Sequence, residues 1–77
     1  MAKVIVYSTS TCPFCVSAKD FLKEHKVKFE EFNVAENREK AMEMVKKSGQ
    51  TGVPVLDIDG KIITGFDKEA ISRALKL

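Results

Sequence analysis

The chain opens with a short apolar run, and apolar positions at helical spacing follow it. The segment from Lys3 to Tyr7 carries apolar, largely β-branched residues at both odd and even positions, which is typical of a strand covered on both faces. We therefore expect this strand to be central in its sheet. Pro13 suits the first turn of a helix, where its missing N–H is not needed. The pattern predicts a helix at about residues 13–25 with a core-facing stripe of Phe14, Ala18, Phe21 and Leu22.

A second strand is predicted from Val27 to Val34. Phe29 and Phe32 stand among charged residues there, so at least one side or edge of this strand should be solvated. A strand, a helix and another strand in this order almost always cross over right-handed, with the two strands parallel. The first half of the chain is therefore predicted to be a βαβ unit.

A second helix is predicted between Asn37, which can cap its start, and Gly49, which can end it. The apolar residues between these two positions recur at helical spacing. Methionines at such spacing more often fill a core than form an adhesive surface. The apolar positions of this helix are Ala41, Met42, Met44 and Val45.

The last third of the chain predicts a hairpin and a final helix. The apolar runs Val55–Ile58 and Lys61–Thr64 are separated by Asp59-Gly60, which favours a two-residue type I′ turn between antiparallel strands. Asp67 is the expected N-cap of a helix that places Ala70, Ile71, Ala74 and Leu75 on one face. The expected fold class is α/β: βαβ followed by ββα, with a four-stranded mixed sheet flanked by three helices.

Length and composition narrow the functional classes. A chain of 77 residues predicts one domain spanning residues 1–77, with 44% hydrophobic and 31% charged residues, as in ordinary globular proteins. The net charge is +2, and Lys and Arg are interleaved with Asp and Glu, so there is no large region of a single charge. We therefore expect neither nucleic acid nor a membrane as partner. The first apolar run is too short for a secretory or membrane segment. We expect a cytoplasmic monomer.

The candidate chemistry lies in Cys12-Pro13-Phe14-Cys15, directly after the first predicted strand and at the start of the first predicted helix. Side chains three apart on a helix are about 5–6 Å apart at Cβ, near the reach of a disulfide. Cytoplasmic thiols are kept reduced, so this pair is better suited to reversible chemistry than to a permanent bridge. A Cys-x-x-Cys pair near a βαβ pattern is the signature of the thioredoxin-like fold.

The two cysteines are expected to have different roles. Cys12 falls at the helix N-terminus, where free N–H groups and the helix dipole stabilise a thiolate, so we expect it to be the nucleophile. Cys15 lies one turn further in and should remain a thiol until it resolves a mixed disulfide on Cys12. Pro13 supports the helix start, whereas Phe14 either packs or forms part of a contact rim.

Two further points follow from the residues alone. The two cysteines and the single histidine, His25, cannot complete a closed four-ligand zinc site, so we expect no metal. Pro54 precedes a predicted strand, a position where proline is tolerated, and most X-Pro bonds are trans.

Three segments of the chain resemble the active-site segments of the glutaredoxin family: Cys12-Pro13-Phe14-Cys15, Val53-Pro54 and Gly65-Phe66-Asp67. The resemblance runs over nearly the whole chain. It implies a cis peptide before Pro54, which would lie beside Cys12, and pairing of the Val53 backbone with the cysteinyl part of glutathione. It also implies that Phe66 and Asp67 hold the γ-glutamyl end, where Gly65 lets the backbone approach closely. Gln50 corresponds to a position that can contact the glycyl carboxylate.

The resemblance implies an oxidoreductase that uses glutathione as co-substrate, with no permanently bound cofactor, to reduce protein disulfides and glutathione mixed disulfides. Thr9 stands where many glutaredoxins have a basic residue, Thr64 replaces the first residue of the usual Gly-Gly, and Lys68 replaces an acid. Thr9 and the missing glycine favour an alternative, a redoxin reduced by a thioredoxin-reductase-type flavoprotein and serving a reductase such as ribonucleotide reductase. Pro13 argues against iron–sulfur binding, which occurs mostly in glutaredoxins with glycine at this position.

Overall fold

The N-terminal apolar run forms an inner strand of the sheet, as predicted. The computed structural model describes residues 3–76. In chain order the elements are β1 (Val4–Ser8), α1 (Pro13–Glu24), β2 (Glu30–Asn33), α2 (Arg38–Ser48), β3 (Val55–Ile58), β4 (Lys61–Thr64) and α3 (Lys68–Leu75). The strands lie in the order β2-β1-β3-β4, with β1 parallel to β2, and with β1 and β4 each antiparallel to β3. The predicted βαβ unit, hairpin and mixed sheet are therefore confirmed.

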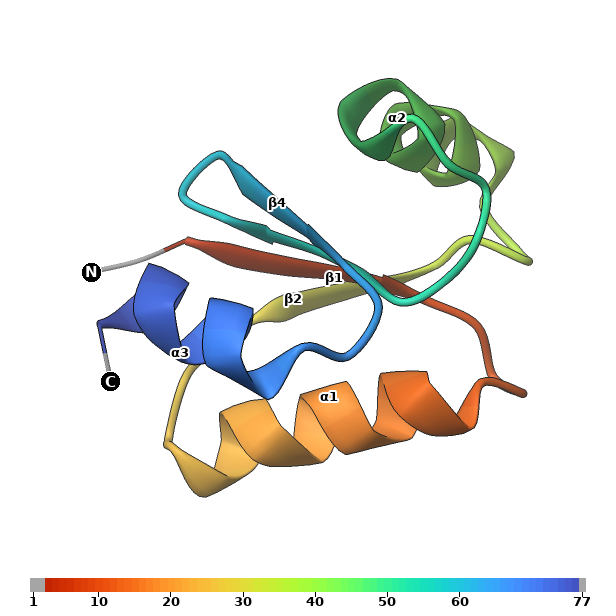
Figure 1. Cartoon of the computed structure of the whole chain (residues 1–77). Helices are drawn as coiled ribbons and strands as arrows, with labels where there is room; N and C mark the ends of the chain where they lie inside the picture. Colours follow the sequence, from red (N-terminus) through yellow and green to blue (C-terminus); the bar gives the residue numbers. More distant parts are fainter. Residues whose placement is uncertain (1–2, 77) are drawn as a thin grey trace.

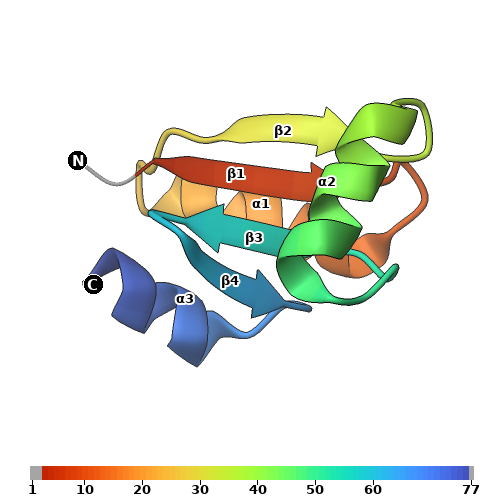
Figure 2. The ribbon, with the colours of Figure 1, turned by 90° about the horizontal axis from the view of Figure 1, so that it is seen from above.

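Helices cover both faces of the sheet. α1 and α3 lie on one face and α2 lies on the other (Figure 1), and Figure 2 shows α2 crossing over the strands. The cluster that includes α1 and α3 contains Val4, Val6, Ala18, Leu22, Leu56, Ile58, Ile63 and Ile71. The smaller cluster beneath α2 contains Tyr7, Met44 and Val55. β1 supplies buried side chains to both clusters. Its apolar residues are therefore buried on both faces, as expected for a strand inside a sheet that is covered by helices on both sides.

The second strand is shorter than the predicted segment Val27–Val34, because β2 begins at Glu30. Lys26 adopts a left-handed conformation with φ of 57°, and the Val27 N–H donates to the Leu22 carbonyl at 2.9 Å. The chain therefore turns at the end of α1 before it extends. Val27 and Phe29 still pack against the core from this connection. The apolar pattern identified their burial but not their backbone conformation.

Three predicted core positions lie at the surface instead. Phe14 is 65% exposed, and in α2 Met42 is 61% and Val45 37% exposed. The buried residues of α1 are Cys15, Ala18 and Leu22, so Phe14 stands one position outside the buried stripe. Met44 is the buried residue of α2. Met42 and Val45 lie on other sides of this helix.

The turn and cap signals are confirmed. Asp59 and Gly60 have φ of 51° and 90°, as a type I′ turn requires. The Asp67 carboxylate accepts the Ala70 N–H at 3.1 Å and so caps α3. Within residues 3–76, no helix combines the length and apolarity needed to cross a membrane.

Candidate active site

Cys12 is the N-cap of α1. Its backbone is extended, with φ of −95° and ψ of 110°, and Pro13 follows in the first turn of the helix. The Cys15 N–H donates to the Cys12 Sγ at 3.2 Å. This bond gives the sulfur one of the N–H groups that have no partner within the helix. Cys12 is also partly exposed, so a nucleophile at this position can reach a substrate in solvent.

Cys15 has the opposite environment. It is fully buried, and this burial is the main reason that its pKa is raised to about 11, with the hydrogen bond to Cys12 adding to the effect. A hydrogen bond from the Thr9 backbone and the charge of Lys19 act in the other direction and lower the pKa. Cys15 is therefore a thiol at neutral pH, as the sequence predicted.

The Val53–Pro54 peptide bond is cis, so the trans bond expected from the residues alone is wrong and the cis bond implied by the family resemblance is present. The Cys12 Sγ donates to the Val53 carbonyl oxygen at 3.8 Å, a long contact that places the two segments side by side. Pro54 is buried, and its carbonyl accepts the Gly65 N–H at 2.8 Å. The fold thus brings all three segments to one place.

The start of α3 supplies further polar groups near this place. Phe66 packs against Phe21 with ring centroids 6.1 Å apart, while Asp67 is exposed. The Asp67 Oδ1 caps the helix, which leaves its other carboxylate oxygen free to accept a bond from a ligand. Lys68 lies with its Nζ 5.8 Å from the centre of the Phe66 ring.

Gln50 lies in the exposed part of the loop between α2 and β3. Its side-chain Nε2 is 3.5 Å from the Gly52 carbonyl oxygen. The structure therefore places Gln50 on the same loop as Val53 and Pro54, where a ligand spanning the loop could reach it. Within residues 3–76, no group of three or more His, Cys, Asp or Glu side chains could hold a metal ion.

The exposure of the Phe14 side chain decides between its two predicted roles, packing in the core and forming part of a contact rim. It is 65% exposed next to Cys12, and Val16 on the same turn is 49% exposed. Neither side chain belongs to the two core clusters. Phe14 is therefore part of the surface around the nucleophile.

A polar group that joins β1, β2 and α1 was not predicted from the sequence. Ser8 is almost fully buried, and its Oγ donates to the Glu31 carboxylate at 2.8 Å. The same carboxylate pairs with Lys19 at 2.6 Å, and the bond from Lys19 is the main reason that the pKa of Glu31 is lowered. Lys19 follows Cys15 by four residues in α1, so it lies on the same side of the helix. This spacing was visible in the sequence, but the pairing with β2 was not.

Comparison with known proteins is consistent with this geometry. The family model described as glutaredoxin matches residues 4–63. Glutaredoxin 3 of Escherichia coli K12 is 43% identical over 67 residues, which cover 87% of this chain and 81% of that protein.

Two solved structures extend the comparison. The glutaredoxin of Archaeoglobus fulgidus superposes with a TM-score of 0.89 at 29% identity, covering 100% of this chain and 89% of its own. The glutaredoxin-like NrdH-redoxin of Escherichia coli, whose structure is described as the basis for a thioredoxin-like activity profile, has a TM-score of 0.82 at 25% identity. That match covers 92% of both chains.

Proposed function

This chain belongs to the glutaredoxin family, and we propose that it uses glutathione to reduce protein disulfides and glutathione mixed disulfides. The chain is a thiol-disulfide oxidoreductase, so the inference concerns the source of its electrons. The observation that carries it is the position of the Cys12 sulfur, 3.8 Å from the Val53 carbonyl oxygen. The loop that bears this carbonyl is joined to the start of α3 through Pro54 and Gly65.

Glutathione would lie across these groups. The Val53 backbone pairs with its cysteinyl part, and the Phe66 N–H and the free oxygen of Asp67 hold its γ-glutamyl end. Gln50 reaches the glycyl carboxylate from the exposed side of the loop. Together these contacts would hold glutathione with its sulfur near Cys12.

Reduction of a glutathione mixed disulfide needs only Cys12. The Cys12 thiolate attacks the glutathione sulfur, the old S–S bond breaks, and the substrate leaves as a thiolate that takes up a proton. The thiolate of a second glutathione then attacks the glutathione sulfur bound to Cys12. This step forms oxidised glutathione and regenerates the Cys12 thiolate.

Reduction of a protein disulfide uses both cysteines. Cys12 attacks one substrate sulfur and forms a mixed disulfide, and the second substrate sulfur leaves as a thiolate. Cys15 then loses its proton and attacks Cys12, which releases the reduced substrate and leaves a bond between Cys12 and Cys15. Two glutathione molecules return this disulfide to two thiols and become oxidised glutathione.

Lys19→Met is expected to slow protein-disulfide reduction about two- to fivefold near neutral pH. Because Lys19 lowers the pKa of Cys15, its loss raises that pKa and reduces the thiolate fraction at each pH. The pH profile of the two-cysteine reaction should therefore move to higher pH. Steady-state rates of protein-disulfide reduction across a range of pH measure this shift. Turnover of glutathione mixed disulfides, measured in the same way, should be unchanged.

Lys23→Met is the matched control, because Lys23 is exposed one turn further along α1. It removes the same charge from the same helix. Equal effects of the two substitutions would contradict a specific role for Lys19.

A second candidate is the redoxin reduced by a thioredoxin-reductase-type flavoprotein and donating electrons to a reductase such as ribonucleotide reductase. The observations that favour it are the likeness to the NrdH-redoxin fold and the residues Thr9, Thr64 and Lys68, which depart from the glutaredoxin pattern. The candidates differ in reduction potential, about −200 to −230 mV for glutaredoxins and about −270 mV for thioredoxin.

The deciding experiment is turnover of the mixed disulfide of glutathione and cysteine, with reduced glutathione recycled by glutathione reductase. The proposal predicts robust turnover and a potential in the glutaredoxin range. Negligible turnover with glutathione, together with reduction by NADPH and thioredoxin reductase, would overturn it in favour of the redoxin.

A further inference from the structure

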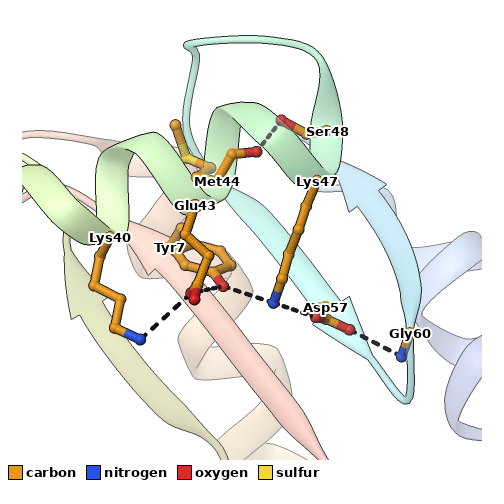
Figure 3. Close-up of polar contacts among 8 residues, drawn as sticks. All are labelled: Tyr7, Lys40, Glu43, Met44, Lys47, Ser48, Asp57 and Gly60. Atoms are coloured by element: carbon orange, nitrogen blue, oxygen red, sulfur yellow. Dashed lines mark hydrogen bonds and ion pairs between the residues drawn. The ribbon is translucent and has the colours of Figure 1, made fainter.

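The loop that carries Gln50, Val53 and Pro54 is bracketed by an ion pair. Lys47, in the last turn of α2, lies with its Nζ 2.7 Å from the Asp57 carboxylate of β3. The pair joins the residues on the two sides of the loop. Figure 3 shows Lys47 reaching from the helix to the strand.

The same ammonium group also bonds to a buried residue of the sheet. Lys47 donates to the Tyr7 hydroxyl at 2.9 Å, and that hydroxyl donates to Glu43 of α2 at 2.6 Å. Tyr7 is fully buried, so loss of its partners would leave a polar group unsatisfied. The bond to Asp57 is the main reason that the pKa of Lys47 is raised above its ordinary value. The ammonium therefore stays charged.

The far end of the ion pair is itself fixed. The Asp57 Oδ1 accepts the Gly60 N–H at 2.9 Å, and the side chain is only 13% exposed. Asp57 thus has a defined position in the hairpin, and Lys47 is held against a rigid partner.

Apolar packing holds α2 only weakly. Its fully buried side chain is Met44, whereas Met42 and Val45 are exposed. By contrast, α1 buries three side chains. The position of the last turn of α2 therefore depends strongly on its polar contacts.

The last turn of α2 leads directly into the loop. The Ser48 Oγ donates to the Met44 carbonyl at 2.7 Å, and the Gln50 N–H donates to the same Oγ at 3.3 Å. A shift of this turn is therefore passed to Gln50, whose side chain lies 3.5 Å from the Gly52 carbonyl, next to Val53 in the chain. Cys12 and Cys15 are held at the start of α1, on the opposite face of the sheet, and Cys12 meets this loop through its long contact with the Val53 carbonyl.

We propose that Lys47 is a positioning residue for substrate binding: held between Tyr7 and Asp57, it fixes the loop that presents Gln50 and Val53 to glutathione. This inference rests on the proposed function. Its role is in binding and not in the chemistry of sulfur exchange, because its bonds go to Tyr7 and Asp57, on the two sides of the base of the loop, and not to the sulfur atoms.

Lys47→Met is expected to raise KM for the mixed disulfide of glutathione and cysteine about three- to tenfold, with kcat within about twofold of wild type. Alkylation of Cys12 by iodoacetamide should change far less than KM, because the bonds of Lys47 go to Tyr7 and Asp57 and not to α1. Asp57→Asn should reproduce part of the effect, and the double variant should lose less than the sum of the two, since both break one interaction.

Two control variants separate this role from general effects. Lys46→Met removes the same charge from an exposed neighbour on α2 and should behave as wild type. Lys47→Arg retains the cation and should restore most of the lost affinity. If KM is unchanged in Lys47→Met, or rises equally in Lys46→Met, the proposal is wrong.

Hydrogen exchange tests the positioning without glutathione. In Lys47→Met the amides of residues 50–53 should exchange faster, while those of α1 keep their wild-type rates. A uniform increase across the chain would mean only lost stability and would overturn the proposal. If wild type shows no turnover with glutathione, the proposed function fails, and the exchange of this loop alone then decides whether Lys47 positions it.

Discussion

Cys12→Ser is expected to lower the rates of both reactions by at least about a thousandfold. The substitution removes the only exposed thiol of the Cys-x-x-Cys pair, and a serine hydroxyl does not exchange with disulfides. Cys15 cannot replace Cys12, because it is buried and its pKa is raised to about 11, so it is almost entirely a thiol at pH 7. Steady-state turnover of a glutathione mixed disulfide and of a protein disulfide measures the loss.

The control for this variant is its fold. Cys12 is an N-cap and only partly buried, and serine is among the preferred N-cap residues, so far-UV circular dichroism and the melting temperature should stay near wild type. Substantial turnover by a folded Cys12→Ser protein would show that Cys12 is not the nucleophile.

Cys15→Ser is expected to separate the two reactions. Protein-disulfide reduction that requires an intramolecular second step should fall at least about a hundredfold, because no second thiol is available to release the substrate. Turnover of glutathione mixed disulfides should stay within about threefold of wild type, because an external glutathione resolves the intermediate on Cys12.

Mass spectrometry provides the independent readout for Cys15→Ser. The variant should accumulate mixed disulfides between Cys12 and the protein substrate, whereas wild type releases the reduced substrate and forms the Cys12–Cys15 bond. If the variant also loses reduction of glutathione mixed disulfides, then Cys15 takes part in both reactions, and the mechanism proposed for one cysteine is wrong.

Parts of the candidate site were predictable because they depend on local sequence. The Cys12 N-cap, the helix start at Pro13 and the cap at Asp67 follow from rules that act over a few residues. The meeting of Cys12 with Val53 joins residues 41 positions apart. From the residues alone nothing indicated this contact or the cis bond, and only the family resemblance led to them.

Side-chain exposure was harder to predict than element type. Phe14, Met42 and Val45 are apolar residues in correctly predicted helices, yet all three are exposed. Helical spacing alone allows more than one face to be the buried one when apolar residues stand at neighbouring positions. The packing of each helix against the sheet decides which face is buried, and the buried residues include Cys15 in α1 and Met44 in α2.

The sequence by itself determined the order of strands and helices along the chain, the parallel pairing of β1 with β2, the antiparallel pairing of β3 with β4, and the cysteine pair at the start of α1. These features follow from hydrophobic periodicity, caps and turns, which act between near neighbours or through well-established connection rules. The tertiary structure alone decided that β1 pairs with β3, that Glu31 joins Ser8 and Lys19, and that Lys47 lies between Tyr7 and Asp57. A charged residue has many possible partners of opposite charge along the sequence. Its actual partner is fixed only when the packed elements bring particular side chains within bonding distance.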